Sequence, residues 1–171
     1  MKKKLSISIM IPCHNEEKMI SACIESCLAQ TRKPDQILVI NDGSTDNTAT
    51  ILKKYKKNKK IDLVDIPVAT GNKSRAEELG IKYLKGDIFI TTDGDTLLHN
   101  NFVEIVEKDF EEDPDLFVVV GYVKSTKYNF LTALREIEYT LGQDLYKFAQ
   151  NYVGFVLVIP GCAGVFRSIL F

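Results

Sequence analysis

The sequence predicts an α/β fold, in which a mostly parallel central sheet carries helices on both faces. Short apolar runs rich in β-branched residues alternate along the chain with amphipathic segments, which is the pattern of β-α-β units. Two of the apolar runs end in acidic loops, at the sheet edge where open α/β folds bind ligands. The chain has 171 residues, of which 45% are hydrophobic and 26% charged. These values predict one globular domain over residues 1–171.

The expected strands are short, apolar and bounded by polar or turn residues. They are Leu5–Ile11, Ile37–Ile40, Ile61–Asp65, Ile88–Thr91, Leu116–Val123 and Val153–Ile159. The expected helices have apolar residues at three- and four-residue steps. They are Asn15–Gln30, Asp46–Tyr55, Lys73–Leu84, Asn101–Glu111 and Tyr128–Asn151. The segment after the last strand, Gly161–Ser168, is expected to turn toward a further helix.

Local signals support several of these boundaries. Asn15 is placed to cap the first helix, and the acids after it suit the positive end of the helix dipole. The turn Asn41–Ser44 ends the second strand, and Asp46 is placed to cap the helix that follows. The segment Tyr128–Asn151 carries an apolar stripe of the kind that faces a core more often than a membrane. The stripe consists of Leu131, Leu134, Ile137, Leu141, Leu145 and Phe148.

Charge and cysteine content restrict the partners and the compartment. The lysine-rich segment Lys53–Lys60 is expected to be a solvated helix end, with a patch for anionic lipid as the alternative. That alternative leaves open a peripheral contact with the inner face of a membrane. The net charge of −1 and the lack of a binding motif argue against nucleic acid as a partner. The four cysteines form no zinc pattern, and there is no signal peptide, so a cytoplasmic protein is expected.

Two acidic loops carry the strongest chemical signal. Asp93 and Asp95 directly follow the expected strand Ile88–Thr91, and Asp42 follows the expected strand Ile37–Ile40. Two acids this close repel one another, which suggests a cation between them. Mg²⁺ and Mn²⁺ take such oxygen ligands and share them with a substrate's phosphates. We therefore expect one metal-dependent site above the carboxyl edge of the sheet, although a capping turn is the plain structural alternative.

Two further segments are candidates for nucleotide contact. The loop Pro12–Glu17 lacks the glycines of a dinucleotide fingerprint, and no phosphate-binding loop with its lysine appears elsewhere. In a functional interpretation, His14 offers a flat ring to a base, and Asn15 and Glu16 offer polar contacts. Lys73 lies near the start of an expected helix, where the dipole disfavours cations, and a phosphate contact would explain it.

Taken together, these motifs resemble the family 2 glycosyltransferases. The resemblance rests on four motifs in order, namely residues 9–17, 39–46, 71–73 and 92–96. It implies a GT-A fold and a nucleotide-sugar donor, most often a UDP-sugar. It also implies nucleotide contacts from the loop Pro12–Glu16 and from Asp42. The pair Asp93 and Asp95, with Gly94 between them, would hold the ribose and the diphosphate-bound Mg²⁺ or Mn²⁺.

The last part of the chain looks closest to the membrane-bound polysaccharide synthases of that family, such as those of chitin, hyaluronan and poly-N-acetylglucosamine. In those enzymes the segment matching Gly161, Cys162, Ala163 and Gly164 borders the acceptor, which would be a glycan or a lipid-linked sugar.

The resemblance also implies where the catalytic base lies. In the family the base is an acid some tens of residues beyond the segment that matches Gly161–Ser168, which places it beyond Phe171, the last residue of this sequence. The last acid in the sequence is Asp144. The resemblance therefore assigns no catalytic residue within the chain, and it predicts donor binding with inverting transfer that is poor or absent.

Two alternatives stay open at this point. One is a nucleotide-sugar-binding module that never catalyses. The other is a phosphatase of the haloacid-dehalogenase type, whose nucleophile lies in an Asp-x-Asp motif, although Leu97 stands where that motif has Thr or Val. A sheet lacking its last elements would also expose an edge, so self-association is a further expectation.

Overall fold

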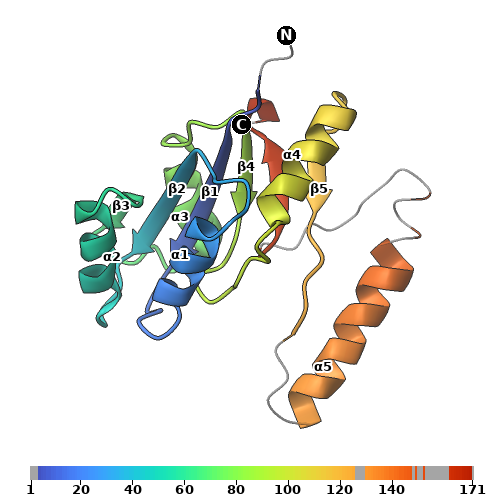
Figure 1. Ribbon diagram of the computed structural model, residues 1–171. Coiled ribbons are helices and arrows are strands. Elements are labelled where there is room, and N and C mark those ends of the chain that lie inside the picture. Colours follow the sequence, from blue (N-terminus) through green and yellow to red (C-terminus); the bar gives the residue numbers. More distant parts are fainter. Residues whose placement is uncertain (1–3, 126–129, 148, 150–151, 153–161, 171) are drawn as a thin grey trace.

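The computed structural model describes residues 4–125, 130–147, 149, 152 and 162–170, and it shows one six-stranded sheet flanked by helices (Figure 1). The strand order is β3-β2-β1-β4-β6-β5. The strands are β1 Ile7–Cys13, β2 Gln36–Asp42, β3 Asp62–Ile66, β4 Ile88–Thr91, β5 Val118–Val120 and β6 Gly164–Arg167. The first four run parallel to one another, and β6 is antiparallel to both of its neighbours. The predicted fold class is confirmed.

Helices cover both faces of the sheet. The α-helices are α1 Ile20–Leu28, α2 Thr48–Lys57, α3 Lys73–Ile81, α4 Phe102–Glu112 and α5 Phe130–Leu141. Alternate residues of the central strands point to opposite faces, as the period of two requires. Ile9 and its neighbours on one face pack against α1, α2 and α4, whereas Met10 and its neighbours on the other face pack against α3. Both faces of β1 and β2 are therefore buried, which explains their continuous apolar sequences.

The first helix begins later than predicted. Its N-cap residue is Met19, and no side chain caps it, so the prediction that Asn15 caps this helix is wrong. Asn15 has a positive φ of 57°, a left-handed conformation that a helix does not continue through. The N-cap residue of α2 is Asn47, and its side chain makes no capping bond. The side chain of Asp46, one residue earlier, instead accepts a hydrogen bond from the Thr48 amide at 3.0 Å, so Asp46 serves the start of α2 as predicted.

The segment Gly161–Ser168, predicted as a turn toward a helix, is instead largely a strand. Strand β6 lies between β4 and β5, and a 3₁₀ turn at Ser168–Leu170 follows it. Val165 is buried on one face of the sheet, and Phe166 stacks on Phe89 of the other face with 5.2 Å between ring centroids. Strand β6 has only four residues, so its sequence is too short to predict a strand reliably. It is held in the sheet by pairing with β4 and β5, which are both distant along the chain.

Helix α5 and a π-helical turn at Gly142–Lys147 confirm most of the long helix expected at residues 128–151. The prediction that its apolar stripe faces the core is wrong for the described side chains. Leu134, Ile137 and Leu141 are 47%, 57% and 56% exposed, and α5 projects away from the sheet (Figure 1). The strand predicted at residues 153–159 lies outside the described residues. In the described part of the chain, every helix is too short or too polar to cross a bilayer.

Candidate functional site

A cavity of about 460 Å³ opens at the carboxyl edge of the parallel strands. Loops that follow β1, β2 and β4 contribute to its wall, together with the start of α3. Every residue predicted to contact the nucleotide lines this cavity except Asn15. These residues are Pro12, His14, Glu16, Asp42, Lys73, Asp93, Gly94 and Asp95. The structure thus brings together side chains from three separate strand ends, as the parallel register requires.

Asn15 lies beside the cavity and holds two loops together. Its side-chain oxygen accepts hydrogen bonds from the Thr45 amide at 2.8 Å and from the Thr45 hydroxyl at 3.3 Å. The backbone amide of Asn15 donates to the Ser44 hydroxyl at 3.0 Å. Through these three contacts, Asn15 joins the loop after β1 to the loop after β2.

Asp42 is oriented by a residue that the sequence did not single out. Its two carboxylate oxygens accept hydrogen bonds from Thr70, one from the amide at 2.7 Å and one from the hydroxyl at 2.8 Å. The Asp42 carbonyl oxygen lies 2.6 Å from Nδ1 of His14. Thr70 belongs to the loop between β3 and α3, which has no sequence feature that would reveal this contact. The loop also places Ala69 and Gly71 against the cavity.

Negative charge accumulates around the loop Asp93–Asp95. Burial raises the pKa of the Glu16 carboxyl, and the charges of Asp95, Asp46 and Asp93 raise it further. Lys73 supplies a positive charge to this loop, since its Nζ pairs with Oδ1 of Asp93. Nζ of Lys73 also lies 3.8 Å from the carboxylate of Glu77, one helical turn further along α3.

The donor set fits a hard divalent cation that is bound together with a phosphate ligand. The described residues contain no group of three or more His, Cys, Asp or Glu side chains placed to hold a metal. Asp93 and Asp95 would therefore supply at most two carboxylates, and Mg²⁺ commonly takes one or two carboxylates with phosphate oxygens and water. The Lys73 ammonium next to Asp93 shows that a positive charge is accommodated there.

The cysteines near the cavity are poor nucleophiles. Burial, followed by the charges of Glu16 and of other nearby acids, raises the pKa of the Cys13 thiol to about 12. Burial also raises the pKa of Cys162, and the charge of Asp93 adds to the effect. The raised pKa values keep both thiols protonated at neutral pH, and they are poor nucleophiles because the thiolate is the reactive form.

The segment predicted to border the acceptor is only partly described. Gly161 lies outside the described residues. Ala163 and Gly164 are engaged in the sheet, since the Ala163 carbonyl accepts a bond from Gly121 at 2.8 Å and the Gly164 carbonyl accepts one from Thr91 at 3.4 Å. Cys162 is half-buried, and the charges of Asp93 and Lys73 both act on its thiol. None of these described residues lines the cavity.

The catalytic base is predicted to lie beyond Phe171, the last residue of the sequence. Phe171 itself lies outside the described residues, so the structure does not test where the base would lie relative to the site. The location of the base beyond Phe171 therefore stays a prediction, and no residue of this chain is assigned that role.

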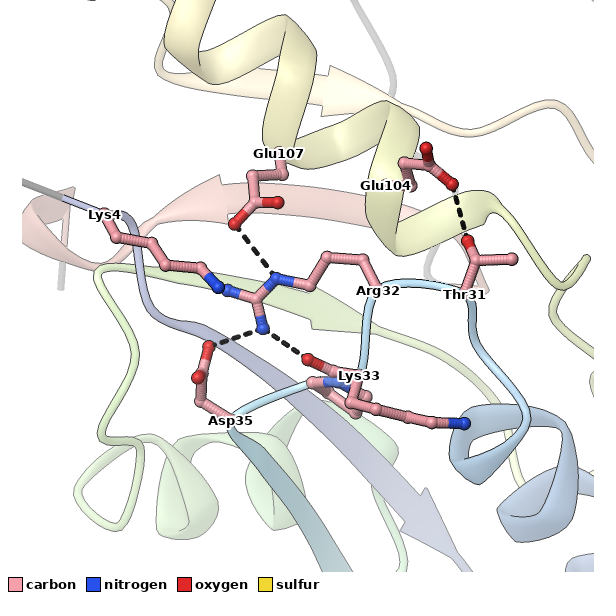
Figure 2. Close-up of a pocket in the computed structure, with 8 residues that line it drawn as sticks. Lys4, Thr31, Arg32, Lys33, Asp35, Glu104 and Glu107 are labelled. Atoms are coloured by element: carbon pink, nitrogen blue, oxygen red, sulfur yellow. Dashed lines mark hydrogen bonds and ion pairs between the residues drawn. The ribbon is translucent and has the colours of Figure 1, made fainter. Parts of the chain in front are cut away.

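A larger hollow, of about 640 Å³, lies at the opposite edge of the sheet (Figure 2). Three of its charged groups, Arg32, Asp35 and Glu107, already pair with one another. Arg32 donates to Glu107 at 2.9 Å, pairs with Asp35 at 2.8 Å and bonds the Leu5 carbonyl at 2.9 Å. Thr31 donates to Glu104 at 2.6 Å. This arrangement ties α4 to the loop before β2 and is structural.

Strand-end carboxylates that converge in one cavity are typical of the ligand sites of open α/β domains. The chain belongs to the family described as Glycosyl transferase family 2, whose profile matches residues 8–171. It is 31% identical over 163 residues to the poly-β-1,6-N-acetyl-D-glucosamine synthase of Staphylococcus epidermidis. That match covers 95% of this chain and 39% of the synthase, so the chain spans about 39% of its relative's length. Family membership confirms the resemblance and excludes the phosphatase alternative.

Solved structures establish the fold as GT-A. A mannosyltransferase from Pyrobaculum calidifontis in complex with GDP-Man and Mn²⁺ matches 97% of this chain and 45% of its own, with a TM-score of 0.73 and 18% identity. S. aureus TarS in complex with UDP-GlcNAc matches 74% of this chain and 36% of its own, with a TM-score of 0.63 and 21% identity. At these identities the likeness concerns the fold alone.

Proposed function

We propose that this chain is the donor-binding part of a glycosyltransferase that takes a nucleotide-sugar, namely a UDP-sugar, together with Mg²⁺ or Mn²⁺. The observation that carries the proposal is the convergence of Asp42, Asp93 and Asp95 on one cavity at the carboxyl edge of the sheet. Membership of Glycosyl transferase family 2 supports it. The relative that makes a poly-N-acetylglucosamine and the neighbour that binds UDP-GlcNAc make UDP-N-acetylglucosamine the first donor to test.

The base of the nucleotide would lie on the side of the cavity formed by Pro12, His14 and Asp42. Thr70 uses one lone pair on each carboxylate oxygen of Asp42, and each oxygen has a second one. Asp42 can therefore still accept a hydrogen bond from a base or ribose. The bond between His14 and the Asp42 carbonyl fixes the imidazole orientation next to that acceptor. Glu16 adds a further acceptor on the same wall.

The diphosphate would lie on the side formed by Lys73, Asp93 and Asp95. Asp93 and Asp95 would hold the divalent cation, which neutralises the departing diphosphate when it is bound. Lys73 would donate to phosphate oxygens as a point charge on a flexible stem. Transfer with inversion to a glycan or a lipid-linked acceptor would be a property of the whole protein, with Cys162 and its neighbours on the acceptor side.

Donor binding is tested by calorimetric titration with UDP, GDP and CDP, each with and without Mn²⁺. We expect UDP to bind most tightly and to need Mn²⁺ for tight binding. Asp95→Asn should lose at least about tenfold in affinity and lose most of the dependence on Mn²⁺, since even indirect changes at metal sites cost that much.

Asp115→Asn is the matched control, because Asp115 is an exposed acid on the loop before β5 that does not line the cavity. It should bind UDP like the unchanged protein. Equal and metal-independent binding of the three nucleotides would refute the proposal.

A further inference from the structure

A cation of the chain itself contacts the predicted metal site. Lys73 is the first residue of α3, and its Nζ reaches across the cavity to Oδ1 of Asp93. The Lys73 side chain is 40% exposed and the Asp93 side chain 37% exposed, so neither group is locked in the interior. Both residues line the same cavity as Asp95.

The position of Lys73 is unfavourable by local rules. The first turn of α3 contains no acid, and the amide groups at a helix start disfavour a positive charge. Asn72 already caps this end, because its side-chain oxygen accepts from the Ser74 amide at 2.9 Å. The ion pairs with Asp93 and, at 3.8 Å, with Glu77 offset the unfavourable position of the lysine. Charge pairing across the cavity therefore accounts for where the ammonium lies.

Asp93 cannot serve this ammonium and a divalent cation at full strength at the same time. Two positive groups on one carboxylate repel each other, and solvent moderates this repulsion because both side chains are part-exposed. A diphosphate would relieve the conflict, because it offers several anionic oxygens within the same cavity. The four-carbon stem of a lysine allows its ammonium to change partner without movement of the helix.

We propose that Lys73 is an exchangeable substitute for the divalent cation, and this rests on the proposed function. Before the donor binds, Lys73 neutralises Asp93 and opposes binding of the divalent cation alone. When the cation arrives with a nucleoside diphosphate, Lys73 leaves Asp93 and pairs with the phosphates. Lys73 thereby couples binding of the cation to binding of the donor, and it acts as a positioning residue.

The coupling is the dissociation constant of Mn²⁺ without UDP divided by its dissociation constant with saturating UDP. Both constants are measured from the electron paramagnetic resonance signal of free Mn²⁺. Lys73→Gln should bind Mn²⁺ alone about two- to fivefold more tightly than the unchanged chain, the range that part-exposed ion pairs support. Its coupling ratio should fall by a similar factor. Lys73→Arg keeps the charge and should retain most of the coupling.

Lys82→Gln is the control, since it removes one positive charge at the other end of α3, away from the cavity. It should leave both constants unchanged. If Lys73→Gln proves unstable by circular dichroism, Lys73→Met provides the same comparison.

The inference fails if Lys73→Gln leaves the affinity for Mn²⁺ alone unchanged, or if Lys82→Gln changes it equally. If the unchanged chain binds neither UDP nor Mn²⁺, the proposed function itself fails. The two failures are therefore distinguishable.

Discussion

Asn15 and Thr70 hold the loops at the carboxyl edge in position through single side-chain contacts. Asn15 joins the loops after β1 and β2, and Thr70 binds both carboxylate oxygens of Asp42. The loop that carries Thr70 also lies close to the backbone of Gly43, whose amide donates to the Ile66 carbonyl at 3.0 Å. The shape of the nucleotide side of the cavity thus depends on these contacts between loops as well as on the residues that line it.

Gly43→Ala tests this dependence. Gly43 has a φ of +59°, and an added Cβ would come within 2.2 Å of the Ala69 amide nitrogen. We expect a loss of about 2–3 kcal/mol in the free energy of unfolding, because backbone strain and displacement of the loop with Thr70 both contribute. UDP binding should weaken as well. Urea denaturation and calorimetry measure the two effects.

Gly71→Ala is the matched comparison for stability. Gly71 also has a positive φ, +71°, but an added Cβ would meet nothing within 4 Å. It should lose only about 1 kcal/mol, the cost of the left-handed conformation itself. Equal losses in the two variants would show that the contact of Gly43 with residue 69 is unimportant.

At the level of elements, α5 departs most from expectation. Its apolar stripe has the spacing of a buried helix, yet Leu134, Ile137 and Leu141 are largely exposed. Gln143, in the π-helical turn after α5, is hydrogen-bonded to the segment that follows β5. Its side-chain amide donates to the Val123 carbonyl and accepts from the Val123 backbone amide, each at 2.6 Å.

Two leucine substitutions compare α5 with a helix in the core. Leu134→Ala should change the free energy of unfolding by less than about 0.5 kcal/mol, as exposed positions do. Leu52→Ala on α2 should cost about 2–5 kcal/mol, because Leu52 is fully buried against the sheet. Both values come from chemical denaturation. If Leu134→Ala is as costly as Leu52→Ala, α5 packs against the domain in solution.

In the molecule as a whole, β6 joins two parts of the sheet that are far apart in sequence. Val165 is fully buried on the face covered by α1 and α4, and Phe166 stacks on Phe89 of β4. Arg167 donates to the Leu116 carbonyl at 2.7 Å, and its guanidinium lies 5.1 Å from the centre of the Phe110 ring. The short strand therefore joins β4 and β5 in one sheet and, through Arg167, anchors α4 to it.

Deletion of residues 162–171 should destabilise the entire domain. Loss of the buried Val165 and the packed Phe166 alone removes about 3–6 kcal/mol of burial, a large part of the stability of a typical domain. Deletion of residues 169–171 is the control, since Ile169 and Leu170 are 82% and 47% exposed. Thermal unfolding followed by circular dichroism should show a clear fall for the first deletion only. A similar small effect of both would mean that β6 contributes little.

The parallel half of the sheet and most of the donor side were predictable from the sequence. Strands β1, β2 and β4 are buried on both faces, so their apolar runs mark them locally, and the polar residues that follow them must meet at one edge. The motif order then identified the family. The roles of the site residues, and the place of the catalytic base beyond Phe171, stay predictions until the binding and transfer experiments are done.

By itself, the sequence determined the β-α-β order, the burial of the first strands and the meeting of Asp42, Asp93 and Asp95, because local periodicity and parallel pairing suffice for these. Only the tertiary structure decided that Gly164–Arg167 is a strand, that Asn15 joins loops, that the stripe of α5 is exposed and that Lys73 pairs with Asp93. Each of these depends on contacts between segments distant in the chain, and such contacts leave no periodic signal in the sequence around them.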